Sequence, residues 1–162
     1  DINKGFWWTH VGWIFHKLPC DHLMDQYVKD IAQDPVYRFF DRTMLLWQAL
    51  LGIVLFLIGG LPFLVWGLFV RLVAVYHSTW FVNSATHRFG RQTYDTGDHS
   101  TNCWWVALIS YGEGWHNNHH AFPRSARHGL RWWELDMTWW MVKGLRALGL
   151  ATKVIAPPRP AG

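Results

Sequence analysis

The chain has 162 residues and a formal net charge of +4. Aromatic residues make up 17% of it and charged residues only 16%, against about 25% charged residues in typical soluble domains. The basic residues are scattered rather than gathered in a stripe, which argues against nucleic-acid binding. The 13 tryptophans favour a protein that meets a membrane surface.

Residues 1–42 are polar with aromatic interruptions, and we expect a cytosolic segment there. Asp34-Pro35 indicates a break or a helix start. The following stretch, Met44–Val70, contains no charged residue, and about 20 apolar residues suffice to span a bilayer. Gly59-Gly60-Leu61-Pro62 lies in its middle and is a strong turn signal. The apolar pattern continues to Val82.

We therefore predict two transmembrane helices, about 41–59 and 61–83, which are joined at Gly59–Pro62, and we assign 43–83 as the membrane segment. A buried hairpin of a soluble protein is the alternative. It is disfavoured because two helices that are apolar all round are hard to cover in so short a chain. Basic residues lie on both sides of the hairpin and none lies in its turn. Because positive residues stay on the cytoplasmic side, we expect a multi-pass integral membrane protein with both flanks cytoplasmic.

Residues 84–156 are polar again and are predicted to form a cytosolic helical cap, followed by a tail at 157–162. Within the cap, Leu130–Leu150 has a helical pattern. The sharpest chemical feature is the run His116–His120, with the sequence HNNHH. Its three histidines share one helix face, so they are aimed at one point or at two adjacent points. Neutral imidazole binds iron, zinc, copper and nickel. A polar loop of a histidine-rich chain remains the alternative.

His87 lies where the second membrane helix should emerge, and Asn83 precedes it by one helical turn. A single histidine at a helix end is usually a cap or an interfacial residue. The hairpin, however, places His87 on the same membrane side as His116–His120, as a shared metal cluster requires. Glu113 and Asp98 are candidate acceptors for imidazole N–H groups behind such ligands, or solvated carboxylates. The other histidines lack ligand spacing, and we assign them structural roles: His10, His16, His22, His77, His99 and His128.

Several long stretches resemble the delta-9 fatty-acid desaturases, especially the bacterial and cyanobacterial branch that acts on acyl-lipids or acyl-CoA. These stretches are Gly5–Trp13, Thr79–His87 and Gly112–Phe122, and the similarity extends through Ser125–Gly129 and Trp132–Glu134. It covers essentially the whole chain, and motifs of this length are highly specific.

The resemblance implies an all-α membrane protein, the C-terminal part of a fold in which four transmembrane helices carry a cytosolic helical cap. It also implies a site for two iron ions. The direct ligands in this chain would be His87, His116, His119 and His120. Asn83 would act through a water molecule, Glu113 would lie behind the ligands, and His10 would lie outside the set.

The sequence also departs from the family pattern. The family has two histidine boxes, H-x-x-x-x-H and H-x-x-H-H, ahead of the stretches matched here, and neither is present. We therefore expect the chain to be truncated and unable to hold a competent di-iron site alone. Members that use acyl-CoA carry a basic pair after the first motif. Only Lys17 remains near that position, which leaves acyl-CoA and acyl-lipid substrates undecided.

The implied activity is the introduction of a cis double bond, at delta-9, into a saturated acyl chain with O2 and two electrons. No protein side chain is oxidant enough for that step, whereas iron with O2 is. A partner such as ferredoxin or cytochrome b5 would supply the electrons. Candidate residues of the acyl tunnel are Trp104, Trp105 and Tyr111, although membrane-surface packing explains each of them as well. A membrane di-iron hydroxylase or mono-oxygenase and a metal-free degenerate membrane protein remain as alternatives.

Overall fold

The computed structural model describes residues 4–16 and 28–157, and its described part is helical without strands. The chain divides into two compact units. We call residues 13–16 and 28–76 the apolar unit, and residues 4–12 and 77–157 the histidine unit. Lys17 and His22 lie outside the described residues.

The apolar unit begins with the short helices η2 (Gly12–Phe15) and α3 (Lys29–Gln33), followed by the long helix α4 (Pro35–Leu64). Asp34 caps α4, because its carboxylate accepts hydrogen bonds from the backbone N–H groups of Val36 (2.7 Å) and Tyr37 (3.3 Å). Proline at the first helical position costs no hydrogen bond there. Asp34-Pro35 is thus a helix start, and the helix begins several residues earlier than its apolar pattern.

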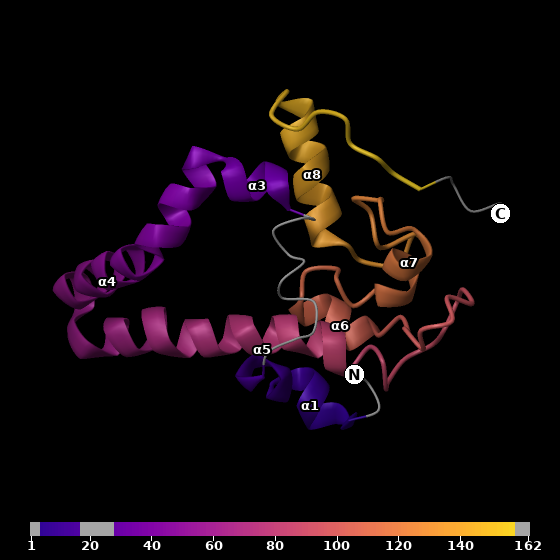
Figure 1. Cartoon of the computed structure of the whole chain (residues 1–162), viewed down its shortest axis with the longest axis horizontal. Coiled ribbons are helices and arrows are strands. Elements are labelled where there is room, and N and C mark those ends of the chain that lie inside the picture. The colour runs from indigo at the N-terminus through magenta and orange to yellow at the C-terminus, as the bar shows by residue number, and fades with distance from the viewer. Residues whose placement is uncertain (1–3, 17–27, 158–162) are drawn as a thin grey trace. The chain divides into compact units, whose positions relative to one another are not determined.

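Helical geometry is interrupted at two residues in the middle of this stretch. Gly59 has φ −143° and Gly60 has φ 65° with ψ −154°, a conformation that is open almost only to glycine. Figure 1 shows the chain reversing direction there. It returns through the π-helix η4 (Val65–Val70) into α5 (Arg71–Ser84). The break falls within the predicted turn Gly59–Pro62.

Glycines let the two limbs of this hairpin approach closely. A Cβ added at Gly52 would lie 3.2 Å from a Leu68 methyl group, and one at Gly67 would lie 2.9 Å from Leu55. Small residues of this kind are enriched where membrane helices pack. The guanidinium of Arg71 donates to the carbonyl of Gly67 (2.9 Å), so this charged group lies along its own helix.

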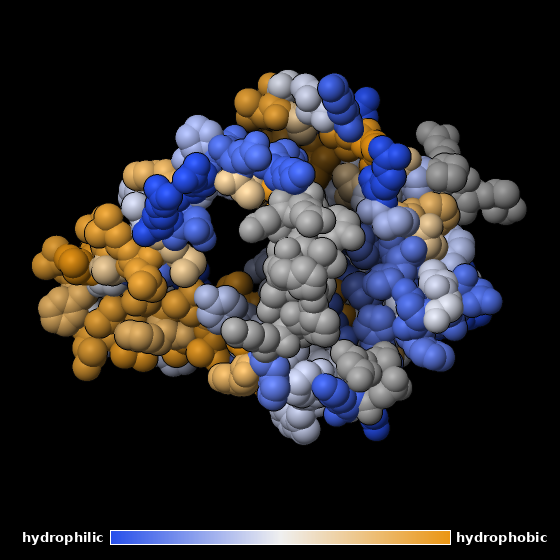
Figure 2. Space-filling view, in the orientation of Figure 1, coloured by the Kyte–Doolittle hydropathy of each residue, from blue (hydrophilic) through white to orange (hydrophobic). Residues whose placement is uncertain are grey.

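The helical stretch Pro35–Ser84 is long and apolar enough to cross a membrane, with a mean hydropathy of 2.5 in its most apolar window. Only 6% of that window is buried, unlike a core helix of a soluble protein. Figure 2 shows apolar side chains gathered over the hairpin around its turn. Such exposure is costly in water and favourable in lipid.

The histidine unit contains the helices α1 (Phe6–His10), α6 (Trp104–Ile109), α7 (His116–Ala121) and α8 (Met137–Ala147), and the end of α5. Its small core is formed by Ala85, Cys103 and Val106, with Phe81 and Trp105 packed against it. Leu130–Leu150 is helical only from Met137. The Glu134 carboxylate binds the backbone N–H groups of Leu130 (2.6 Å) and Arg131 (3.0 Å), which closes a turn instead of a helix.

Candidate metal centre

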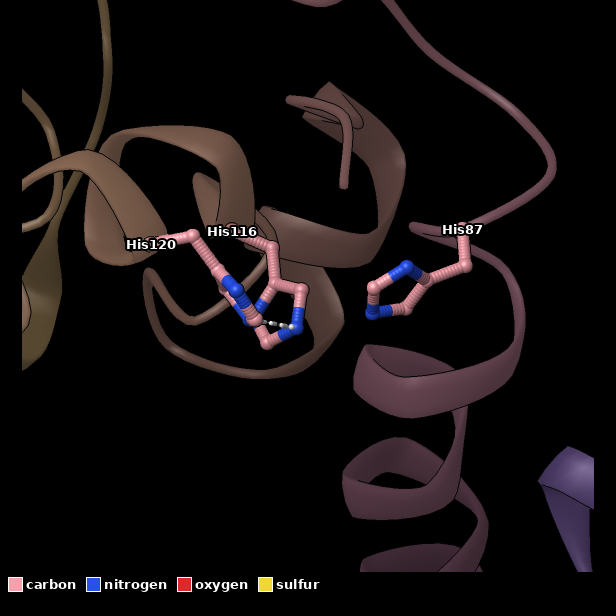
Figure 3. Close-up of side chains that lie close together, drawn as sticks. All are labelled: His87, His116 and His120. Carbon is pink, nitrogen blue, oxygen red and sulfur yellow. Dashed lines mark hydrogen bonds between the residues drawn. The ribbon is translucent and has the colours of Figure 1, made fainter. Parts of the chain in front are cut away.

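Three imidazoles from two separate segments converge in the histidine unit. His116 and His120 lie one turn apart on α7, and His87 follows the end of α5. One nitrogen of each lies within 4.8 Å of those of the other two. The Nε2 atoms of His116 and His120 are 2.9 Å apart, and the ring of His87 faces both (Figure 3). A single ion can therefore be reached by all three.

Polar partners behind the cluster fix the orientation of two of these rings. Nδ1 of His120 contacts the carboxylate of Asp98, which turns Nε2 toward the cluster. Nδ1 of His87 lies 3.2 Å from the backbone carbonyl of Asp98. Metal-binding histidines commonly donate their second N–H to such acceptors. Of the two predicted acceptors, Asp98 is thus the one beside the three-imidazole cluster.

The pKa shifts of His87 and His116 favour the neutral imidazole. Burial, and then the neighbouring His120 and His87, lower the pKa of His116 to about 3. Burial and the proximity of His120 likewise lower the pKa of His87. Burial alone would raise the pKa of Asp98, but hydrogen bonds from Thr96 and Ser100 outweigh it and lower the pKa overall. Neutral imidazole is the form that binds a metal.

The two asparagines of the HNNHH run, Asn117 and Asn118, are buried and hold α7 in place through hydrogen bonds. The side-chain oxygen of Asn117 accepts hydrogen bonds from the backbone N–H groups of Thr93 and Tyr94, both at 2.7 Å. Its amide nitrogen donates to the carbonyl of Tyr94 at 2.9 Å. Asn117 thereby ties α7 to the loop that carries Asp98. No periodic pattern in the sequence marks this role.

Asn118 joins α7 to the segments that carry Asn102, His128 and Glu134. Its oxygen accepts from the amide of Asn102 (2.7 Å), and its nitrogen donates to Glu134 and to the carbonyl of His128, both at 2.9 Å. Every polar atom of this buried side chain therefore has a partner. A buried amide that loses its partners costs about 1–3 kcal/mol.

His119 is not part of the three-nitrogen group, although its ring lies 5.6 Å from that of His120 and 5.9 Å from that of His116, between centroids. Its ring lies 4.6 Å from that of His128, between centroids, and its buried Nδ1 has no hydrogen-bond partner. His128 in turn pairs with Glu113 at 3.2 Å. The hydrogen bond with His128 outweighs burial and lowers the pKa of Glu113. The same hydrogen bond raises the pKa of His128 against the effect of burial. Glu113 thus pairs with His128, whose ring lies beside that of His119, and not with the three-imidazole cluster. Ligand spacing in the sequence does not reveal this role of His128.

The remaining predicted site residues differ in how far they are exposed to solvent. Asn83 is exposed on the last turn of α5. Trp105 packs edge-on against Phe81 with a centroid distance of 5.6 Å. Trp104 and Tyr111 are 64% and 61% exposed. The water-mediated role of Asn83 and the tunnel roles of Trp104, Trp105 and Tyr111 remain predictions.

His10 belongs to a separate buried cluster. Its Nδ1 lies 2.8 Å from the hydroxyl of Ser84, and its Nε2 lies 2.9 Å from Nδ1 of His77. Because the Ser84 hydroxyl donates to the carbonyl of Trp80, it can only accept from His10. This fixes α1 to α5 and agrees with a structural role for His10 and His77.

The donor set fits a transition metal. It offers neutral nitrogen ligands, acceptors behind two of them, and one buried imidazole nitrogen, Nδ1 of His119, without a partner. Orphaned polar atoms are rare in protein interiors. Iron, zinc, copper and nickel all accept imidazole, so the geometry alone describes an apolar helical hairpin and a histidine cluster that could hold one of these metals.

Comparison with known proteins identifies the family to which the chain belongs. Residues 1–153 match the fatty acid desaturase family, and the chain belongs to that family. It is 55% identical to an sn-1 stearoyl-lipid 9-desaturase of Synechocystis and 58% identical to one of Anabaena variabilis, over 99% and 95% of the chain. An acyl-CoA 5-desaturase of Anemone leveillei is 47% identical over 95% of the chain. The matches cover 51%, 57% and 49% of those relatives, so the chain spans about half their length.

Proposed function

We propose that this chain is the C-terminal part of a membrane desaturase that introduces a cis double bond at delta-9 of a saturated acyl chain. The observation that carries the proposal is the convergence of His87 with His116 and His120. The family match and the names of the relatives from Synechocystis and Anabaena variabilis support the reaction type. They also favour an acyl-lipid over an acyl-CoA substrate.

In this proposal two irons with O2 supply the oxidising power that removes hydrogen from an unactivated methylene pair. The protein favours the neutral form of His87 and His116 and orients the rings of His87 and His120. Asp98 turns His120, and the Asp98 carbonyl orients His87. His119, with its unpartnered Nδ1, and Asn83 through a water, complete what this chain offers. Any further ligands would have to come from residues outside this chain.

The hairpin has a matching role. Both limbs, Pro35–Ile58 and Leu61–Ser84, would cross the bilayer and return the chain to the cytoplasmic side, where the histidine unit would act. This multi-pass arrangement is supported by the break at Gly59 and Gly60 and by the absence of basic residues at the turn. The apolar acyl chain would reach the metals from the bilayer.

The test is expression of the complete protein, meaning the full product of the gene that encodes this chain, in cells supplied with isotopically labelled saturated fatty acid. We expect labelled lipids with a cis double bond at delta-9, located by mass spectrometry. His119→Ala and His120→Ala should abolish the product without removing the protein from the membrane. Hydroxylated chains without new double bonds would instead establish the hydroxylase alternative.

His99→Asn is the matched control. His99 is an exposed histidine in the loop that carries Asp98, and it has a positive φ of 59°, which asparagine tolerates. We expect this variant to keep the activity of the wild type. Loss of activity in all three variants alike would show that substitution disturbs folding rather than a metal site.

A further inference from the structure

A pocket of about 320 Å3 opens on the histidine unit, away from the imidazole nitrogens that face one another. Its floor is made of three buried residues, Asn102, Trp115 and Glu134. Asn102 pairs through its backbone with Arg91 and contacts Trp115 in isolated bridges, and the indole N–H of Trp115 donates to the carbonyl of Leu135 at 2.8 Å. The floor is therefore a fixed part of the fold.

The rim of the pocket is cationic and aromatic. Arg91, Arg131, Trp104 and Trp133 line it and are exposed. The guanidinium of Arg131 lies 5.7 Å from the centroid of the Trp133 ring, a cation–π arrangement that holds it at the rim. Arginine and tryptophan are the residue types that most often dominate binding energy at protein interfaces.

The acidic residue in the pocket, Glu134, offsets only one of the two positive charges at the rim. The Glu134 carboxylate at the floor accepts hydrogen bonds from Asn118 and from the backbone N–H groups of Leu130 and Arg131. These bonds fix the carboxylate at the floor, and two arginines against one glutamate leave the lining with a formal charge of +1. The two arginines leave a positive, partly aromatic surface, which is complementary to carboxylates of a partner.

The floor of the pocket is connected to the helix that carries His116 and His120. Trp115 of the floor immediately precedes His116 in the chain. Asn102 and Glu134 hold Asn118, which lies between the metal-facing histidines of α7. A group bound over the pocket would thus contact residues that are linked to α7 by the chain and by hydrogen bonds.

We propose that this pocket, with Arg91 and Arg131 at its rim, is the docking surface for an acidic electron-carrier protein. The inference rests on the proposed function. Desaturation turns one O2, two hydrogens of the acyl chain, two electrons and two protons into a double bond and two waters. The electrons arrive singly from the carrier and the protons come from water. The chain has two cysteines, fewer than a cysteine-ligated iron–sulfur cluster needs, so this chain cannot hold such a cluster alone.

A small docking surface suits this partner. Electron-transfer complexes are brief and form interfaces below about 1,200 Å2. Opposite charges speed their association by about 10- to 1,000-fold at low salt. A shallow rim with two exposed guanidinium groups and two exposed indoles provides steering and contact without a deep interface.

The test measures turnover of the complete protein in nanodiscs with three electron sources: reduced plant-type ferredoxin, reduced cytochrome b5, and dithionite with a small mediator. In Arg91→Glu/Arg131→Glu we expect the protein-supported rate to fall by at least about 10-fold at low salt. The dithionite-supported rate should stay within twofold of the wild type. Arg146→Glu, at an exposed position on α8 outside the pocket, is the charge-matched control and should leave every rate unchanged.

Several results would overturn the docking assignment. An unchanged protein-supported rate in the double variant would do so, as would an equal loss with dithionite, which would indicate a structural role. A raised KM for the acyl-lipid instead of the carrier would assign the pocket to a lipid head group. Turnover with dithionite but with neither carrier would exclude an acidic partner of these classes. Absence of turnover with all sources in the wild type would instead contradict the proposed function.

Discussion

At the scale of single residues, the candidate site depends on imidazoles that remain neutral. The pKa of His116 is about 3 in the folded chain because burial, and then the neighbouring imidazoles, disfavour its charged form. In the unfolded chain a histidine titrates near 6.5. As pH falls from 6.5 toward 3, the unfolded state therefore binds a proton that the folded state does not. The stability that this histidine contributes is complete above pH 6.5 and is lost progressively below it.

We therefore expect the free energy of unfolding of the metal-free chain in detergent to fall between pH 7 and pH 5, before most carboxylates titrate. Urea denaturation followed by tryptophan fluorescence at several pH values measures it. His116→Asn should make this dependence shallower, because this residue no longer titrates, while His87 and His119, whose pKa values burial also lowers, remain. Equal slopes for the two proteins would show that His116 does not carry the effect.

The sequence predicted part of this residue-level arrangement. Helical spacing alone places His116 and His120 on one face, since they are four residues apart. It does not reveal the roles of Asn117, Asn118 or His128, because these side chains meet their partners through loops, whose path follows no periodicity. His119 differs from its two neighbours in the same run because its ring lies against His128.

At the scale of elements, α6 and the turn before α7 touch backbone to backbone. A Cβ at Gly114 would lie 2.1 Å from the backbone nitrogen of Ala107 and 2.6 Å from the carbonyl oxygen of Cys103. The carbonyl of Gly114 also accepts from the N–H of Cys103 at 2.8 Å. Only glycine permits this contact, which fixes where α7 starts and hence where His116 lies.

Gly114→Ala should accordingly destabilise the chain by about 1–3 kcal/mol or more, because backbone atoms cannot give way as a flexible side chain would. Gly144→Ala is the matched control. A Cβ at Gly144 on α8 meets nothing within 4 Å, and alanine is the better helix former by about 0.5–1 kcal/mol. Chemical denaturation of both variants in detergent compares them. Equal stabilities would mean that the α6 contact is not as close as described.

The sequence predicts a helix or a turn correctly where the residues that determine it are neighbours in the chain. The long apolar run, Asp34-Pro35 and Gly59-Gly60 each act on their own neighbours, so the hairpin follows from the sequence. The stretch Leu130–Leu150 shows the opposite case. Its first residues have a helical pattern, but the buried carboxylates of Glu134 and Asp136 bind nearby backbone N–H groups, including that of Gly129. Such side-chain hydrogen bonds compete with a helix.

At the scale of the whole molecule, the proposed desaturase requires a particular passage through the bilayer. Each limb of the hairpin, Pro35–Ile58 and Leu61–Ser84, is roughly 36 Å long at about 1.5 Å per residue. The hydrocarbon core is about 30 Å thick. Each limb is thus long enough to cross once, and the reversal at Gly60 brings the chain back to the side from which it entered.

Residues before and after the hairpin should therefore lie on the same side of the membrane, and its turn on the other. The measurement is labelling of single cysteines, at Lys29, Leu61 or Arg91, by a membrane-impermeant maleimide in intact spheroplasts, with Cys20 and Cys103 replaced by serine. We expect Leu61→Cys to be labelled directly, and Lys29→Cys and Arg91→Cys only after permeabilisation. If Lys29→Cys and Arg91→Cys were labelled from opposite sides, the hairpin would cross only once. The histidine unit would then lie across the membrane from the segment before Pro35, and the proposed topology would be wrong.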